Sequence, residues 1–173
     1  MKPYELYLLR HAKSDWETDA VTDFQRPLNK RGKKAARQIG EYLANKISGS
    51  ILIVSSPALR AWQTAVTVSQ ALNVPEEEIT FIGEIYMATA EELVNVLAKI
   101  PKNEKKVLLI GHNPGLEELL DFIVQDEIPE TNDGKILTTA ALAHVQLTQD
   151  WQHLDNGKGK LQELHRPRKK EMN

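Results

Sequence analysis

Short apolar runs alternate along the chain with longer stretches in which apolar residues recur every three or four positions. The strongest runs are 6–9, 51–54 and 107–110, and 80–82 is a weaker one. The strong runs are almost continuously apolar, which is typical of strands covered by helices on both faces. Their alternation with helical stretches predicts an α/β fold.

Four stretches have the periodicity of amphipathic helices, and most begin with a recognisable start signal. Asn29 is suited to cap the first helix. Ser56-Pro57 predicts a cap and a first-turn proline for the second. Thr89 and Glu92 form a capping-box pattern before the third. The apolar stripes themselves cover 36–47, 58–72, 93–100 and 116–123.

The last third of the chain has a different pattern. Residues 141–147 alternate between apolar and other side chains, which predicts a half-buried strand. Asp155-Asn156-Gly157 predicts a hairpin turn, after which 160–164 return as an edge strand. We therefore expect a three-layer α/β/α sandwich with a mostly parallel central sheet. It would form a single catalytic domain over residues 1–165, followed by a solvated basic tail at 166–173.

Composition narrows the function classes. The length of 173 residues suits one domain, and a net charge of −2 does not favour a nucleic-acid partner. The chain has no cysteine, which excludes disulfides, thiolate nucleophiles and cysteine-ligated metal sites. We find no signal peptide and no run near the roughly 20 apolar residues of a membrane span. We therefore expect a cytoplasmic protein without a membrane partner.

Arginine and histidine follow the ends of all three strong strand candidates. Arg10-His11 follows the first, Arg60 lies in the opening turn of the helix after the second, and His112 follows the third. In an open α/β sheet, ligands bind beyond the carboxyl ends of the strands. Helix N-termini at this edge attract anions, and arginine presents a fork of donors to phosphate oxygens. The pattern predicts a small anionic site, with phosphate as the natural ligand.

The segments around these positions resemble the motifs of the histidine phosphatase superfamily, which has a phosphoglycerate mutase-like fold. Residues 8–14 resemble its first motif, with Ala12 in place of the usual glycine, and residues 55–65 resemble its second. Residues 110–114 resemble its third, and 137–143 are similar to a late segment of the SixA-type phosphohistidine phosphatases. All four occur in the family's order.

This resemblance implies roles for the clustered residues. His11 would be the nucleophile that becomes phosphorylated, and Arg10, Arg60 and His112 would hold the phosphoryl oxygens. Neighbouring cations disfavour protonation of an imidazole, which keeps it nucleophilic. Because guanidinium groups supply the positive charge, no metal and no cofactor are expected.

Further candidates stand beside this core. Ser14 is a candidate phosphate ligand, and Glu84 matches the position of the general acid in larger relatives. An isolated glutamate after a weak strand is equally well explained as an exposed side chain. Trp16 and Trp62 are expected to pack into the protein rather than to line the pocket.

The segment between the second motif and Glu84 bears on the substrate. It consists mostly of one predicted helix, whereas phosphoglycerate mutase relatives carry insertions there that form a lid. An open, shallow site suits a phosphorylated side chain on a protein. The resemblance therefore implies a metal-independent phosphatase of phosphohistidine on a phosphotransfer domain. The alternatives are a phosphatase of small phosphomonoesters and a non-catalytic phosphate-binding module.

Overall fold

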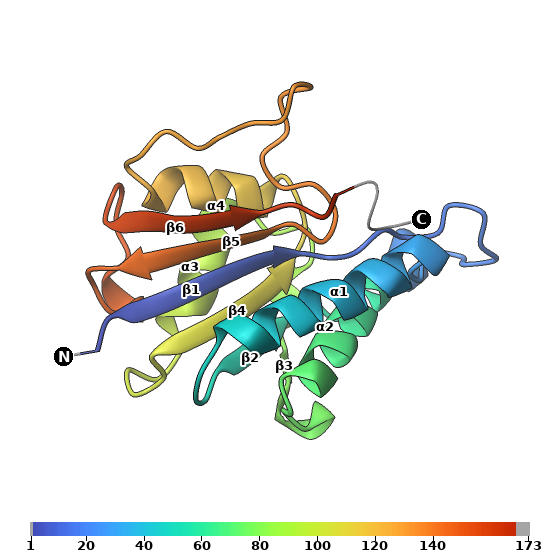
Figure 1. Cartoon of the computed structure of the whole chain (residues 1–173), viewed down its shortest axis with the longest axis horizontal. Helices are drawn as coiled ribbons and strands as arrows, with labels where there is room; N and C mark the ends of the chain where they lie inside the picture. Colours follow the sequence, from blue (N-terminus) through green and yellow to red (C-terminus); the bar gives the residue numbers. More distant parts are fainter. Residues whose placement is uncertain (1, 169–173) are drawn as a thin grey trace.

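A computed structural model describes residues 2–168 and contains a central six-stranded sheet (Figure 1). Its strands are β1 (Tyr4–Arg10), β2 (Leu52–Ser55), β3 (Thr80–Phe81), β4 (Lys106–Gly111), β5 (Leu142–Leu147) and β6 (Gly159–His165). They lie in the order β3-β2-β4-β1-β5-β6. The first four are parallel, and β5 and β6 are antiparallel to their neighbours. The mostly parallel sheet is as predicted.

Helices cover both faces of this sheet. The hydrophobic cluster on one face includes residues of α1 (Lys30–Lys46) and α2 (Leu59–Ala71). The cluster on the other face includes residues of α3 (Ala90–Ala98) and α4 (Gly115–Ile123). The predicted α/β/α sandwich is confirmed, and it matches the phosphoglycerate mutase-like fold. No helix in the described part of the chain is long and apolar enough to span a membrane.

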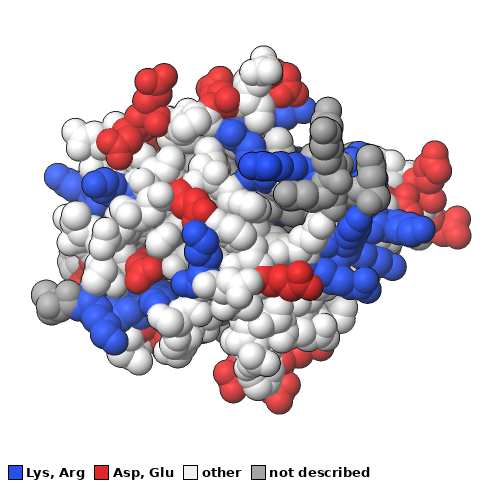
Figure 2. All heavy atoms as spheres, in the orientation of Figure 1, with Lys and Arg blue, Asp and Glu red and all other residues white. Residues whose placement is uncertain are grey.

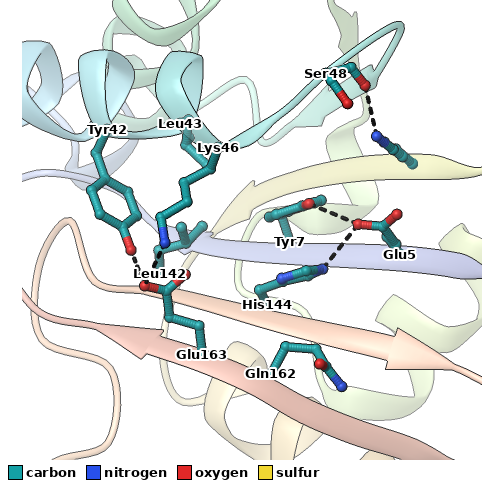
Figure 3. Close-up of a pocket in the computed structure, with 11 residues that line it drawn as sticks. Glu5, Tyr7, Tyr42, Leu43, Lys46, Ser48, Leu142, His144, Gln162 and Glu163 are labelled. Carbon is teal, nitrogen blue, oxygen red and sulfur yellow. Dashed lines mark hydrogen bonds and ion pairs between the residues drawn. The ribbon is translucent and has the colours of Figure 1, made fainter.

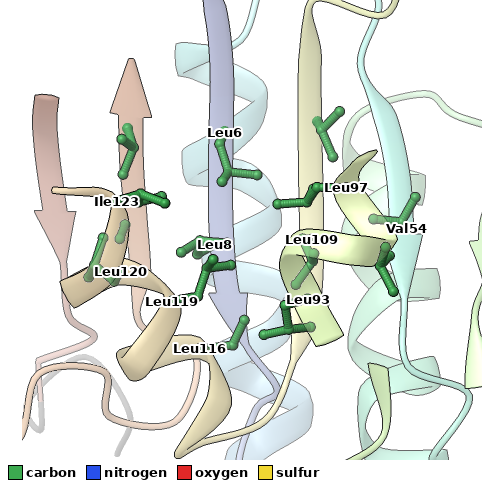
Figure 4. Packing of buried hydrophobic residues seen from close by; sticks show 14 of the residues in the cluster. Leu6, Leu8, Val54, Leu93, Leu97, Leu109, Leu116, Leu119, Leu120 and Ile123 are labelled. Carbon is green, nitrogen blue, oxygen red and sulfur yellow. The ribbon is translucent and has the colours of Figure 1, made fainter. Parts of the chain in front are cut away.

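The central strand β1 shows why its apolar run is continuous. Leu6 and Leu8 point toward α3 and α4, whereas Tyr7 and Leu9 belong to the cluster beneath α1 and α2 (Figure 4). Each of these leucines is fully buried. Burying one such side chain contributes about 1.5–3 kcal/mol. A strand covered on both faces therefore needs an apolar residue at every position, not at every second one.

The helix start signals have mixed outcomes. Asn29 caps α1 by accepting a hydrogen bond from the Gly32 backbone N–H at 2.8 Å, and Thr89 forms the predicted capping box. The prediction for Ser56-Pro57 is wrong, because α2 begins at Leu59 and its N-cap is Ala58. The Ser56 hydroxyl still accepts from the Ala58 N–H at 3.2 Å, but it also contacts a histidine from β4's end, so it belongs to the site described below.

The C-terminal hairpin is longer than predicted. Residues 160–164 lie within the antiparallel edge strand β6, as expected. However, β5 ends at Leu147 and β6 begins at Gly159, so Asp155-Asn156-Gly157 is not a two-residue hairpin connection. The longer connection allows Trp151 to be fully buried, with its indole N–H donating to the Glu104 carbonyl at 2.6 Å.

The predicted basic tail is described only in part. Arg166 follows β6 directly, and its Nε donates to the Ile136 carbonyl at 2.8 Å. This contact holds the start of the tail against the loop before β5. Residues 169–173 lie outside the described residues.

Candidate active site

The candidate site lies where β1, β2 and β4 end. Arg10, the last residue of β1, pairs with Gly111, the last residue of β4, and Ser55 at the end of β2 pairs with Ile110. The His11 backbone N–H donates to the Gly111 carbonyl at 3.1 Å. These bonds place the three strand ends side by side at one edge of the sheet, on the right in Figure 1.

The structure brings the four predicted core residues together at this edge. The ring centroids of His11 and His112 are 5.1 Å apart. Arg60 Nη2 lies 3.4 Å from His112 Nδ1, and Arg10 is close enough for its charge to affect both histidines. Arg10 is held from behind by a 2.9 Å hydrogen bond from its Nη1 to the Leu137 carbonyl. The result is a nearly buried group of two imidazoles and two guanidinium groups.

The orientation of His11 is fixed by its neighbour. Its Nδ1 lies 2.7 Å from the Ala12 carbonyl, an acceptor, so Nδ1 carries the hydrogen and the lone pair is on Nε2. The Ala12 N–H in turn donates to Thr64 Oγ1 at 3.1 Å, one helical turn after Arg60. Ala12 is buried and does not have a positive φ, so alanine is compatible with this position.

Both histidines are held in the neutral form. Burial, together with the charges of His112, Arg60 and Arg10, lowers the pKa of His11 from 6.5 to about 3, although the hydrogen bond to Ala12 opposes this. Burial and the Arg60 charge lower the pKa of His112 to about 4. A neutral imidazole has a free lone pair, so His11 can act as a nucleophile without first losing a proton.

The segment between β1 and α1 supplies two charged residues that the sequence analysis missed. Asp23 accepts from Arg60 twice, through its backbone carbonyl at 2.8 Å and its Oδ2 at 3.0 Å. Its Oδ1 accepts from Arg26 at 2.9 Å, and the Tyr86 hydroxyl donates to Oδ2 at 2.8 Å. Partial burial acts to raise the pKa of Asp23, but these bonds and the Arg60 charge hold it well below its usual range. Asp23 therefore clamps two arginines at the mouth of the site.

Arg26, the second of these residues, is a buried cation. Only 8% of its surface is exposed, and its charge acts on His112. A buried arginine is rare unless it is paired, which marks it as part of the cationic group. The sequence feature that could have identified Arg26 is its position three residues after Asp23. The 3-10 turn at 23–25 brings these two side chains together as an ion pair. Without periodicity in this loop, that spacing alone did not single out either residue.

Three other predicted residues lie differently from the core. Ser14 is buried, and its hydroxyl accepts from Arg26, so its link to the site runs through that arginine. Glu84 lies in a 3-10 turn (Gly83–Ile85), is 64% exposed and pairs with Lys99 at 3.9 Å. Packing of Trp16 into the protein was predicted wrongly: it is 78% exposed, with Arg26 over its ring at 3.6 Å.

A match to a family model identifies the superfamily of this chain. The model of the histidine phosphatase superfamily, branch 1, matches residues 6–106, which include the ends of β1 and β2. The chain belongs to this superfamily. This membership and the phosphatase names of two relatives support a phosphatase, and hence a hydrolase.

Three relatives illustrate the range of similarity within the superfamily. A chloroplastic protein of Arabidopsis thaliana is 33% identical over 126 residues, which are 68% of this chain but only 58% of that protein. The phosphatase PhoE of Bacillus subtilis is 30% identical, with 83% and 88% of the two chains covered. The phosphohistidine phosphatase SixA of Escherichia coli is 29% identical, with 83% and 85% covered.

Solved structures of the superfamily agree with the fold. A structure from Nakamurella multipartitia, assigned as a phosphohistidine phosphatase SixA, has a TM-score of 0.80 at 24% identity and covers 96% of this chain and 98% of its own. The structure of the protein histidine phosphatase SixA complexed with tungstate has a TM-score of 0.73 at 27% identity, with 92% and 95% covered.

The lowered pKa of His11 in this phosphatase predicts a stability that falls in acid. Between about pH 6.5 and about pH 3 the unfolded chain binds a proton on this residue that the folded chain does not. The free energy of unfolding therefore decreases as the pH falls through this window. Urea titrations at pH 7 and pH 5 give the free energy of unfolding at each pH. We expect this free energy to fall less between pH 7 and pH 5 in His11→Ala than in the parent. In His153→Ala, a change at an exposed position, it should fall as much as in the parent. An equal loss in all three proteins would contradict the buried neutral imidazole.

A second hollow lies on another part of the phosphatase, between α1 and strands β1, β5 and β6 (Figure 3). Its polar groups satisfy one another: Glu5 accepts from Tyr7 at 2.9 Å and contacts His144 at 3.1 Å. Lys46 lies 3.6 Å from Glu163. Because these charges neutralise one another, the hollow lacks the surplus of cations found at the strand ends.

Proposed function

We propose that this chain is a metal-independent phosphohistidine phosphatase that removes phosphoryl groups from protein histidine through a phosphohistidine intermediate on His11. The observation that carries the proposal is the neutral imidazole of His11, held by Ala12 with its lone pair on Nε2 and surrounded by cations. An unprotonated nucleophile next to fixed positive charge is what attack on a phosphoryl group needs.

The proposed reaction has two steps. In the first, His11 Nε2 forms a bond to phosphorus while the bond from phosphorus to the substrate nitrogen breaks, and the leaving imidazole takes up a proton. In the second, water attacks the phosphorus of the phosphorylated enzyme, which releases inorganic phosphate and restores neutral His11. The backbone contact of Nδ1 with Ala12 keeps Nε2 directed at the reacting group throughout.

Arginines would stabilise the charge on the group in transfer. Arg10 and Arg60 are fixed by the Leu137 and Asp23 carbonyls before any substrate binds, so their orientation costs nothing during the reaction. His112 is joined to Ser56 by a 2.8 Å hydrogen bond and completes this wall. Because guanidinium groups already supply the positive charge, the proposed mechanism includes no metal and no cofactor.

The substrate assignment rests on the short segment between Arg60 and Glu84 and on the relatives. Between Arg60 and Glu84 the chain forms α2, a short 3-10 turn and the two-residue strand β3, so this segment carries no insertion like the lid of phosphoglycerate mutase relatives. A solved SixA protein histidine phosphatase holds tungstate, an oxyanion that resembles phosphate. Both facts support a phosphorylated protein, in the form of a phosphotransfer domain, as the partner. A cytoplasmic location is part of the same proposal.

Glu84 is expected to contribute little as a proton donor. Its carboxylate pairs with Lys99, which follows the last residue of α3, and most of its side chain is exposed to solvent. The P–N bond of phosphohistidine also needs less help from an acid than a phosphate ester does. We expect Glu84→Gln to lower kcat by less than about tenfold, whereas removal of a true general acid costs about 10²–10⁴-fold. Steady-state kinetics on a phosphohistidine protein measures this, and a hundredfold loss would assign the acid to Glu84.

The proposal is tested by substrate preference. With a chelator present, kcat/KM is measured for a phosphotransfer domain phosphorylated on histidine, for p-nitrophenyl phosphate and for a panel of sugar phosphates. We expect the phosphohistidine protein to be the best substrate by a wide margin. A preference for a sugar phosphate would instead favour the phosphatase of small phosphomonoesters. Phosphate binding without turnover of any compound would favour the non-catalytic module.

A further inference from the structure

Exposed apolar side chains lie on two segments that contribute residues to the cationic site. Trp16, Val21 and Phe24 lie in the loop between β1 and α1 and are 78%, 89% and 39% exposed. Met87 follows the 3-10 turn before α3 and is 74% exposed. Within residues 2–168 the only other large hydrophobic side chain of this exposure is Trp62, two residues after Arg60. Exposed apolar groups that gather in one place mark an interaction surface.

Direct contacts connect two members of this apolar rim, defined here as Trp16, Val21, Phe24 and Met87, to the site. The Arg26 guanidinium lies over the Trp16 ring at 3.6 Å. The Phe24 ring meets the Tyr86 ring edge-on at 5.1 Å, and Tyr86 meets His112 edge-on at 5.5 Å. A molecule whose phosphoryl group reaches His112 would therefore lie close to Trp16 and Phe24.

Met87 combines an exposed side chain with a strained backbone conformation. Its φ is 54°, in the left-handed region where residues with a side chain are strained and glycine is not. Strained residues cluster at binding and catalytic sites. A methionine kept in this conformation with most of its surface in solvent is better explained by a contact with a partner than by packing, because its side chain is flexible and adapts to varied surfaces.

Charge distinguishes between the two large partners that an apolar rim could fit. Asp15, Glu17 and Asp19 alternate along the same loop, and acidic side chains lie at the far right of the molecule, next to a group of basic side chains (Figure 2). These carboxylates would be repelled by an anionic phospholipid surface. They suit a protein that carries basic side chains near its phosphoryl group.

We propose that the apolar rim is the docking surface for the phosphoprotein substrate. The partner is a protein with an apolar surface around its phosphorylated histidine and basic residues at the edge of that surface. The phosphoryl group pairs with the arginines while apolar residues of the partner cover Trp16, Phe24 and Met87. This inference rests on the proposed function and adds to it the part of the enzyme that distinguishes a protein from a small phosphate ester.

The test compares a protein substrate with a small one in a variant that does not disturb the fold. Met87→Gly removes the side chain and relieves the left-handed backbone, so its melting temperature is expected to equal or exceed the parent's. We expect kcat/KM to fall about tenfold on a phosphohistidine phosphotransfer domain and to stay within about twofold on p-nitrophenyl phosphate. Val21→Ser, at the most exposed rim position, should show the same selective loss.

A matched control shows whether the change in kinetics comes from loss of the Met87 side chain or from placing glycine at a position with positive φ. Asn73 has a φ of 55° and follows the C-terminal end of α2, the end remote from Arg60, so Asn73→Gly makes the same backbone change away from the rim. It should leave both substrates unaffected. Unchanged kinetics on the phosphoprotein in both rim variants would overturn the docking surface while leaving phosphohistidine hydrolysis intact. An equal loss on both substrates would also overturn it, since Met87 would then act on the reaction itself.

Two further outcomes concern the identity of the partner. If the parent enzyme turns over p-nitrophenyl phosphate but not the phosphoprotein, the proposed function fails and the docking surface fails with it. Binding of the parent to vesicles of anionic phospholipid, lost in Met87→Gly, would assign the rim to a membrane and overturn the protein partner. Sedimentation of the protein with such vesicles measures this directly.

Discussion

Replacing His11 with alanine is expected to abolish turnover of the phosphohistidine substrate, with a loss of at least about 10⁴-fold in kcat. The reason is that Nε2 of this residue is the only proposed site of the covalent intermediate, so neither step of the reaction can proceed by the same route. The remaining arginines would still bind phosphate. We therefore expect binding of inorganic phosphate or tungstate to persist in His11→Ala while kcat is lost, which stopped-flow kinetics and calorimetry measure separately.

A matched variant makes this result interpretable. His153→Ala removes an exposed histidine that pairs with Asp150, remote from the strand ends, and should retain full activity. The His11 variant should also stay folded, because the replaced imidazole contributes no charge to the structure at neutral pH. Residual activity above about one per cent in His11→Ala, after its fold has been verified by circular dichroism, would contradict a nucleophilic role.

The second large effect is expected at Arg60. Its Nη1 and Nη2 donate to the carbonyl and carboxylate of Asp23, and Nη2 also lies next to His112. Arg60→Ala would remove one cation from the phosphoryl cradle and release the loop that Asp23 anchors. Loss of one preorganised donor of this kind costs about 10²–10³-fold in kcat. The loss should therefore be smaller than that at His11 but large enough to measure with the same assay.

The lysine variant distinguishes charge from geometry. Arg60→Lys keeps a positive charge but cannot donate to both acceptors of Asp23 and to a phosphoryl oxygen through a rigid fork. We expect it to recover only part of the activity lost in Arg60→Ala. Arg37→Ala, at an exposed position on α1, serves as the control and should be fully active. Full activity of Arg60→Lys would show that the charge alone matters and would contradict the fork geometry.

The sheet was predicted well because the burial of its strands can be recognised from consecutive residues. A strand buried on both faces must be apolar at successive positions, as Leu6 to Leu9 are, and this pattern needs no knowledge of the rest of the chain. The parallel arrangement then puts the ends of these strands at one edge. For that reason the clustering of Arg10, His11 and His112 follows from their places in the sequence alone.

The parts that sequence reasoning missed depend on contacts between distant segments. Asp23 and Tyr86 are 63 positions apart, and only the folded loop brings the carboxylate to the hydroxyl. The exposure of Trp16 was likewise predicted wrongly, since hydrophobic character alone favours burial while its ring here is exposed and stacks on the buried Arg26. The roles assigned to Ser14 and Glu84 stay predictions until their variants are measured.

Passage of the phosphoryl group through His11 can be observed in one rapid-quench experiment. A phosphotransfer domain carrying radiolabelled phosphohistidine is mixed with the enzyme in the presence of a chelator, and the reaction is stopped in alkali, where phosphohistidine survives. We expect label on His11 within the first turnover, followed by release of inorganic phosphate. Release of phosphate in the first turnover with no label on the enzyme, or with label on another residue, would contradict it.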